Sequence, residues 1–380
     1  AVSAQLADFA KHLADTPGRV LVVAGPEVAR HNARGELSDL LDRLDAFVAV
    51  SPDAKDAVDG DDPRLLGVIG VMGHPAVERV LRHGVTCVCI GTTMPVMTRG
   101  GVDFATTPVL SIGSATPHIP SRHLQTEDLS STLAQLAAAV PARSDSLDSE
   151  TLYAPTHLEP PAHDGDGVRY HDGMHILDRV IPAEADIFVD AGNTGAAAVH
   201  YLGARHRGRY VVALGMGGMG YAFGAGIGCA FARGGRTVVV AGDGAFFMHG
   251  MEIHTAIEHR LPVTFVIVNN NAHAMCVTRE QLYYGGEYSF NRFTPSHIGA
   301  GMAAMFPSLM CHSADTVADF EAAMHAAMAH GGPAVVEVIC STDEIPPFAP
   351  FLSSDIAKEK THDRHDYRSI QAWPESLARA

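Results

Sequence analysis

Basic residues, paired cysteines and long apolar runs are all scarce in this chain of 380 residues. No apolar run approaches the ~20 residues that span a bilayer, and the N-terminal segment lacks the pattern of a secretory signal. We therefore expect a cytoplasmic protein that does not enter a membrane. The formal charge of −16 disfavours nucleic-acid binding through phosphate neutralisation. The 47% of apolar residues and 37 glycines are typical of a compact α/β protein.

The six cysteines stand singly, except for Cys87 and Cys89 inside the apolar run VTCVCI. That spacing places both thiols on one face of a predicted strand. The sequence contains no CxxC pair, so a zinc or redox site is disfavoured. We interpret the cysteines as buried, reduced thiols.

Continuous apolar strands separated by amphipathic helices occur in two series, which predicts two doubly wound parallel sheets covered on both faces. The first series occupies a Rossmann-like α/β domain, residues 1–140. A Pro-, Ser-, Asp- and Glu-rich stretch, 141–167, is interpreted as a linker. The second α/β domain is predicted over 168–350. The charged, aperiodic tail 351–380 is expected to need a partner or ligand to become ordered.

Polar residues follow two consecutive apolar strands of the second domain. VVVAGDG ends at 242–244, and the next strand ends in three asparagines, 269–271. Neighbouring parallel strands bring such side chains to one carboxyl edge, where ligands of open α/β sheets bind. Carboxylate and amide oxygens suit Mg²⁺. Gly244 and Ala245 lead into a helix predicted from Phe246. The free N–H groups at the start of that helix favour the binding of a diphosphate. The residue types thus predict a metal–diphosphate site, although a lone GDG is more often turn material.

The full order of strand, GDG, helix, strand and NNN resembles the signature of thiamin-diphosphate (ThDP) enzymes. DAGNTGAAA and ALGMGGMGYAFGAGIGCAFA resemble segments of that family's diphosphate (PP) domain. AMCVTREQLYY and the closing GPAVVEV are most similar to the acetohydroxyacid synthase type. The first domain, beginning VLVVAGPEV, resembles the family's central domain. The resemblance implies that 1–140 is the central domain and 168–350 the ThDP- and Mg²⁺-binding PP domain.

The resemblance also implies a set of contacts to the cofactor. Mg²⁺ would be bound by Asp243, Asn270 and the backbone carbonyl of Ala272. Met219 would hold ThDP in its V shape, and the Gly217 carbonyl would accept from the 4′-amino group. The other expected cofactor-binding residues flank these positions: Gly192, Asn193, Thr194, Gly242, Gly244, Ala245, His273, Ala274 and Met275. Without GDG and NNN, Met219 would be interpreted equally well as core filler, and Asn193-Thr194 as a helix cap.

Relatives of this type carry a pyrimidine-binding (PYR) domain, whose glutamate bonds N1′ of the aminopyrimidine. No PYR-like segment surrounds Glu27, Glu36, Glu78, Glu127 or Glu150. We expect this general acid/base to come from a separate PYR-domain subunit, in a hetero-oligomer of α2β2 type. The chain alone is expected to be nearly inert.

Three further residues are candidates for catalysis beside Met219. Arg279 stands where acetohydroxyacid synthases carry a tryptophan, and it could clamp an anionic acceptor or simply pair with Glu280 or Glu287. His249 follows the GDG turn and His273 follows the asparagines, so either could handle protons. No signal for FAD is found. The pairs His171/His175 and His254/His259 could share helix faces, but no carboxylate cluster completes a metal site, so they are interpreted as exposed or capping residues.

The sequence therefore predicts the ThDP- and Mg²⁺-binding subunit of a split carboligase. Such an enzyme decarboxylates a 2-oxo acid such as pyruvate and transfers the acyl anion equivalent to a carbonyl acceptor. Two alternatives stay open, namely a non-oxidative 2-oxo acid decarboxylase subunit and a non-catalytic ThDP-binding regulatory subunit.

Overall fold

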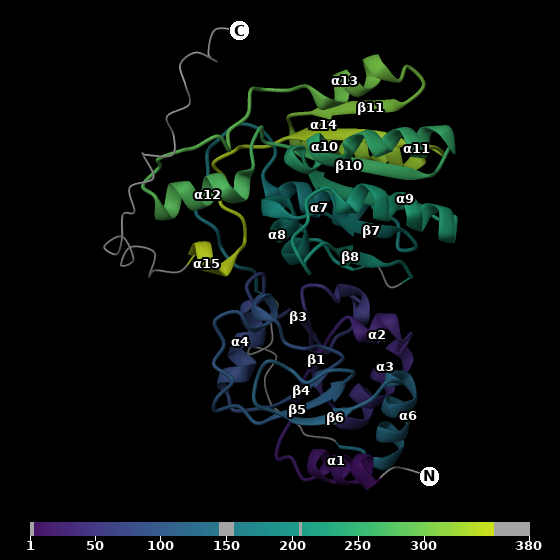
Figure 1. The fold of residues 1–380 in the computed structure, drawn as a ribbon, viewed down its shortest axis with the longest axis vertical. Coiled ribbons are helices and arrows are strands. Elements are labelled where there is room, and N and C mark those ends of the chain that lie inside the picture. Colours follow the sequence, from purple (N-terminus) through teal and green to yellow (C-terminus); the bar gives the residue numbers. More distant parts are fainter. Residues whose placement is uncertain (1–3, 144–155, 205–206, 353–380) are drawn as a thin grey trace.

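Apolar strands buried on both faces form two separate parallel sheets, as Figure 1 shows. Every residue of the central strands β1 (Val20–Ala24), β4 (Thr86–Ile90) and β10 (Val263–Asn269) is buried, as continuous apolar runs require. The computed structural model describes residues 4–143, 156–204 and 207–352. The predicted fold class, two doubly wound α/β domains, is confirmed.

The first sheet has the order β3-β2-β1-β4-β5-β6. Its other strands are β2 (Phe47–Val50), β3 (Leu65–Val68), β5 (Val109–Gly113) and β6 (Arg122–Gln125). The helices around it are α1 (Ala4–Ala14), α2 (Glu27–Arg30), α3 (Arg34–Leu44), α4 (Pro75–Arg82), α5 (Val96–Arg99) and α6 (Leu129–Ala139), with a 3-10 turn η1 (Lys55–Ala57).

The second sheet has the order β11-β12-β10-β9-β7-β8. The remaining strands are β7 (Asp186–Val189), β8 (Tyr210–Val212), β9 (Thr237–Gly242), β11 (Met310–Ala314) and β12 (Ala334–Ile339). The helices are α7 (Tyr170–Val180), α8 (Gly192–Tyr201), α9 (Tyr221–Arg233), α10 (Asp243–His249), α11 (Ile253–Glu258), α12 (Ala274–Tyr283), α13 (Ile298–Met305), α14 (Val317–Ala329) and α15 (Ala349–Leu352), with a 3-10 turn η2 (Gly250–Glu252). The strand order reverses between β7 and β9, which is the position where ligands bind in such sheets.

Several elements differ from the sequence prediction. One helix was predicted over 246–259, but α10 begins earlier, at Asp243, and is separated from α11 by η2 at Gly250, because glycine weakens a helix interior. Helix α7 begins at Tyr170, whereas the periodicity indicated a start near His175. Within the described residues, no helix combines the length and apolar character needed to cross a membrane. The predicted domain boundaries stay predictions, and most of the tail 351–380 lies outside the described residues.

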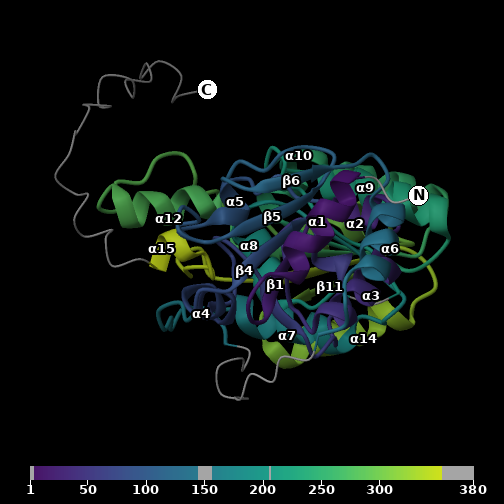
Figure 2. The ribbon, with the colours of Figure 1, turned by 90° about the horizontal axis from the view of Figure 1, so that it is seen from below.

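Helix α12 stands apart from the layers over the second sheet, and both views place α15 beside it (Figures 1 and 2). The hydroxyl of Tyr283 donates to the Pro350 carbonyl at 3.0 Å, and the rings of Tyr283 and Phe351 lie 6.3 Å apart. These contacts attach the projecting helix to the end of the described chain.

Buried charges join the two domains. The ammonium group of Lys55 is buried and donates to the carbonyls of Ala198, at 3.5 Å, Val199, at 2.6 Å, and Leu202 at the C-terminal end of α8. The neighbouring Asp56 accepts from Arg209 at 2.5 Å and from Arg34 at 3.0 Å. A cation at the negative end of a helix dipole is favourable, so the first domain stabilises a helix of the second.

Three histidines meet at the same interface, with ring nitrogens within 4.8 Å of one another: His74, His157 and His200. The rings of His74 and His200 stack with centroids 4.4 Å apart. The backbone N–H of Val68 donates to His74 Nδ1, and that of Leu158 donates to His200 Nε2, each at 3.0 Å. These bonds occupy the nitrogen lone pairs that a metal would need. We therefore interpret the cluster as neutral imidazoles and not as a metal site.

The histidine cluster predicts acid sensitivity. Burial lowers the pKa of His74 to about 2 and the pKa of His200 to about 4. At these two positions the unfolded chain binds more protons, so their contribution to the free energy of unfolding should fall as the pH drops below about 6.5, by ~2 kcal/mol per histidine at pH 5. Urea unfolding at pH 7 and pH 5 measures this. The His74→Gln variant should lose part of the decrease, whereas the exposed His12→Gln should keep it. Equal pH dependence in wild type and His74→Gln would refute the assignment.

Candidate active site

The predicted polar residues come together at the carboxyl edge of the second sheet. Val268 of β10 pairs with Gly242 of β9, so the GDG and NNN segments leave the sheet side by side. Helix α8 begins at Gly192, beside the neighbouring strand β7. The site thus occupies the reversal point of the strand order, where loops after β7, β9 and β10 converge.

Asp243 is the first residue of α10 and its side chain is only 1% exposed. Its Oδ2 accepts from the backbone N–H of Ala272 at 3.0 Å. Burial nevertheless raises the pKa of Asp243 to about 7, although nearby backbone N–H groups lower it. A carboxylate removed from water in this way gains much from a bound cation.

Two buried asparagines near this edge of the sheet each leave an amide oxygen free. Asn270 donates through Nδ2 to the Tyr170 hydroxyl at 3.0 Å, and Asn193 donates through Nδ2 to Thr278 Oγ1 at 3.1 Å. The Oδ1 atoms of both asparagines are buried without a hydrogen-bond partner, a costly state for a polar atom. The Asp243 carboxylate and the Asn270 oxygen are hard oxygens of the kind that suits a divalent cation, whereas Asn193 lies at the start of α8, where the diphosphate is predicted. The residues present therefore fit Mg²⁺ and a diphosphate.

The other asparagines serve the structure. Asn269 donates to Glu337 Oε1 at 2.7 Å and accepts from the N–H of Asn271 at 3.1 Å. Asn271 adopts a positive φ of 52° and accepts from the N–H of Ser296 at 2.8 Å. Glu337 also accepts from the N–H groups of Ile298 and Gly299. Of the NNN segment, Asn270 alone carries an unpartnered buried oxygen among the described residues.

Met219 and His273 meet over Gly244. A Cβ atom on Gly244 would lie 2.7 Å from His273 Nδ1 and 3.0 Å from Met219 Cε, so glycine is required for this approach. His273 Nδ1 is buried and without a partner, and the ring packs edge-on to Phe293 at 4.6 Å. The structure thus places the predicted Met219 and His273 at one site.

His249, at the end of α10, lies against the turn that carries Met219. Its Nδ1 would be 2.2 Å from a Cβ on Gly220, which has a positive φ of 86°. The preceding Gly217 also has a positive φ, of 64°, and is exposed. Ala272, Ala274 and the other predicted contact residues lie at the starts of α8, α10 and α12. Their contacts to the cofactor stay predictions.

Arg279 lies on the exposed side of α12. Glu280 instead accepts from Ser289, and from Asn291 at 2.8 Å. No ion pair of Arg279 with Glu280 or Glu287 is present in the described part of the chain, and its clamping role stays a prediction.

Asp190 is a residue that the sequence reasoning missed. Its buried carboxylate accepts from the N–H groups of Gly220 and Ala222, each at 3.0 Å. It therefore ties the end of β7 to the turn around Met219 and caps the start of α9. The DAG sequence immediately before Asn193 was the available signal, because an acidic residue at a strand end often holds a neighbouring turn.

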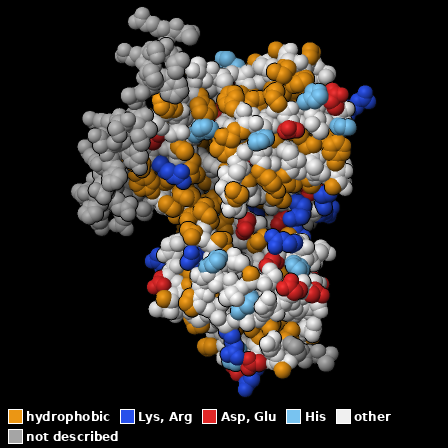
Figure 3. All heavy atoms as spheres, in the orientation of Figure 1, with side chains coloured by type: hydrophobic (Ala, Val, Ile, Leu, Met, Phe, Trp, Pro, Cys, Tyr) orange, Lys and Arg blue, Asp and Glu red, His pale blue; other side chains and the backbone are white. Residues whose placement is uncertain are grey.

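The face of the site is open and apolar. Met216 is 99% exposed, and further apolar residues beside the site's segments are exposed: Tyr221, Phe247, Met248, Met251, Tyr284, Tyr288 and Phe290. Figure 3 shows apolar side chains spread over the upper lobe, which holds the second sheet. Exposed apolar clusters of this kind mark surfaces that bind another protein.

Comparison with known proteins agrees with the geometry. Residues 6–136 match the central domain of thiamine pyrophosphate enzymes, and residues 190–338 match their C-terminal TPP binding domain. The chain is 31% identical over 185 residues to the "Putative acetolactate synthase large subunit IlvB2" of Mycobacterium tuberculosis, covering 47% of this chain and 32% of that protein. It is 24% identical to the sulfoacetaldehyde acetyltransferase of Alcaligenes xylosoxydans xylosoxydans, covering 86% of this chain and 62% of that protein.

A solved structure shares the fold. The benzoylformate decarboxylase from Polynucleobacter necessarius superposes with a TM-score of 0.74 at 17% identity, covering 90% of this chain and 65% of that one. The chain thus spans between about a third and two thirds of the length of these proteins. With its two matched regions in the order central domain then TPP binding domain, the chain belongs to the thiamine pyrophosphate enzyme family.

Proposed function

We propose that this chain supplies the ThDP- and Mg²⁺-binding half of a carboligase. The enzyme would decarboxylate a 2-oxo acid such as pyruvate and transfer the acyl group to a carbonyl acceptor. The observation that carries the proposal is the buried Asp243 carboxylate beside the unpartnered Asn270 oxygen. Similarity to proteins named acetolactate synthase and sulfoacetaldehyde acetyltransferase supports the acyl-transfer reaction.

Each part of the site has a distinct task. Asp243, Asn270 and the carbonyl of Ala272 would hold Mg²⁺, and the N-terminal N–H groups of α8 would bind the diphosphate. Bound ThDP supplies the electron sink for decarboxylation and acyl transfer. Met219 supports the cofactor, while His249 and His273 hold or move protons on the reacting side. Arg279 would bind a carboxylate or phosphate of the acceptor through two parallel hydrogen bonds.

A second polypeptide is proposed to supply the PYR-type glutamate. Carboxylates near the site are already engaged: Asp190 holds the N–H groups of Gly220 and Ala222, and Glu280 holds Ser289 and Asn291. The exposed apolar side chains around the site provide a surface for this partner, in a hetero-oligomer of α2β2 type. Acetolactate synthase relatives are named as large subunits, which supports a multisubunit assembly.

Product identification tests the proposal. The purified chain is incubated with Mg²⁺, ThDP and pyruvate, with and without a PYR-type polypeptide, and with and without an aldehyde or 2-oxo acid acceptor. We expect the coupled product only when both polypeptides and the acceptor are present. Acetaldehyde as the sole product would establish a decarboxylase. Full turnover by the chain alone would contradict the need for a partner. Unchanged function of the complex with Asp243→Ala, despite lost ThDP binding, would indicate a regulatory subunit.

A further inference from the structure

Tyr170 contacts a proposed metal ligand from a distant part of the sequence. It is the first residue of α7, is only 2% exposed, and precedes Asn270 by 100 residues. Its hydroxyl oxygen accepts from Asn270 Nδ2 at 3.0 Å. The backbone carbonyl of Asn270 is held independently, by a 2.5 Å hydrogen bond from Thr342 Oγ1.

The bond to Tyr170 takes up the NH₂ side of the Asn270 amide and leaves its oxygen side available. An asparagine side chain carries an oxygen on one side and an NH₂ group on the other, and only the oxygen can bind a cation. Because Nδ2 faces Tyr170, Oδ1 is left buried and without a partner. A flipped amide would present two N–H donors to the cation and repel it.

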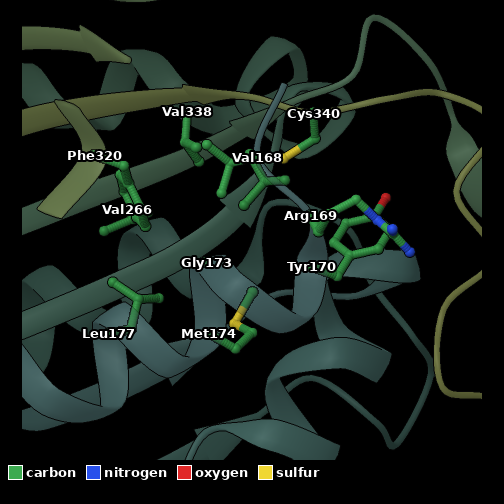
Figure 4. A pocket seen from close by; sticks show the side chains of 11 residues that line it. Val168, Arg169, Tyr170, Gly173, Met174, Leu177, Val266, Phe320, Val338 and Cys340 are labelled. Carbon is green, nitrogen blue, oxygen red and sulfur yellow. The ribbon is translucent and has the colours of Figure 1, made fainter. Parts of the chain in front are cut away.

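The packing around Tyr170 keeps this hydroxyl in place. Figure 4 shows Tyr170 beside Arg169, at the edge of a small cavity that is also lined by Val168, Met174, Val266, Val338 and Cys340, among others. The cavity has a volume of about 10 Å³, at the limit for a single water, and its lining is largely apolar.

We propose that Tyr170 is a positioning residue for the metal site, which fixes the Asn270 side chain with its oxygen available beside Asp243. The proposal rests on the proposed function, since it concerns the cation that accompanies ThDP. Residues outside the metal's own ligands that orient them commonly change metal affinity 10- to 100-fold.

The test uses the full chain, with its PYR-type partner where that is needed for uptake. Mg²⁺ is titrated by calorimetry into metal-free protein at saturating ThDP. We expect Tyr170→Phe to weaken Mg²⁺ binding about 10- to 100-fold. The matched control is Tyr210→Phe, which removes another buried hydroxyl that donates to the Ala198 carbonyl at 2.7 Å. It should leave Mg²⁺ affinity within about twofold of wild type, since Tyr210 contacts no proposed ligand.

A second variant, Asn270→Asp, distinguishes a loss of side-chain orientation at position 270 from a general disturbance of the structure. In Asn270→Asp both terminal atoms are oxygens, so the orientation of the group no longer matters. Adding Tyr170→Phe to Asn270→Asp should then change Mg²⁺ affinity less than about threefold, as a double-mutant cycle measures. Equal Mg²⁺ affinity of Tyr170→Phe and wild type overturns the proposal, as does a loss of the same size in the Asn270→Asp background. Failure of the wild type to take up Mg²⁺ with ThDP overturns the proposed function itself, and with it this role.

Discussion

Replacing Asp243 by asparagine is expected to abolish Mg²⁺-dependent ThDP binding while making the cofactor-free chain more stable at alkaline pH. Cofactor affinity should fall by about 100-fold or more, since a direct ligand matters at least as much as a residue that orients one. The buried carboxylate has a pKa raised to about 7, so the folded chain binds a proton more tightly than the unfolded one. The contribution of Asp243 to the free energy of unfolding should therefore decrease as the pH rises from about 4 to 7, by roughly 4 kcal/mol in all, opposite in sign to the contribution of the buried histidines.

Thermal melts at pH 5 and pH 8, with and without Mg²⁺ and ThDP, measure both effects. In Asp243→Asn the cofactor-induced rise in melting temperature should be lost. The contribution of Asp243 to the pH dependence should also be lost, so the variant should lose more stability than the wild type between pH 8 and pH 5, because only the opposite contribution of His74 and His200 remains. Asp186 provides a matched control. It is a buried carboxylate at the start of β7, at the opposite edge of the sheet from Asp243, and it pairs with Arg233 at 2.9 Å. Asp186→Asn should lower stability and leave cofactor binding intact. Undiminished ThDP binding by Asp243→Asn would contradict the site.

Lys55→Met is expected to have the largest effect on stability. The ammonium group donates to the carbonyls of Ala198, Val199 and Leu202. Methionine removes this donor, although the Ala198 carbonyl still accepts from the Tyr210 hydroxyl. We expect a loss of about 3 kcal/mol or more, because each abandoned buried acceptor costs ~1–3 kcal/mol. Urea unfolding checks the loss, and separate transitions for the two domains would show that their docking is weakened.

Lys11→Met is the control for this change. Lys11 is exposed in the last turn of α1, so the same substitution there should change stability by less than about 0.5 kcal/mol. Indistinguishable unfolding curves for Lys55→Met and wild type would show that the buried ammonium group does not hold the interface.

Local patterns in the sequence were sufficient to predict the centre of the site. The GDG and NNN segments end consecutive apolar strands, and β9 and β10 are direct neighbours in the sheet. Continuous runs of apolar residues, without polar residues at alternate positions, also predicted the central strands of both sheets. The edge strands β6 and β11 escaped prediction because they are only partly buried, so their residues show no apolar run.

The supporting residues could not be predicted because their contacts cross long stretches of chain. Tyr170 reaches Asn270 across 100 residues, and Asp190 reaches Ala222 across 32. Neither contact leaves a periodic pattern in the sequence. Likewise, only coordinates distinguish Asn270, with its unpartnered oxygen, from Asn269, whose amide holds Glu337.

The position of α8 has a consequence for communication within the molecule. The helix has 10 residues and is therefore about 15 Å long, with its positive end at the proposed diphosphate site and its negative end on Lys55. Both ends contribute to the alignment of one rigid rod. Any coupling between a ligand at one end and domain docking at the other would be reciprocal, so each would change the other by the same factor.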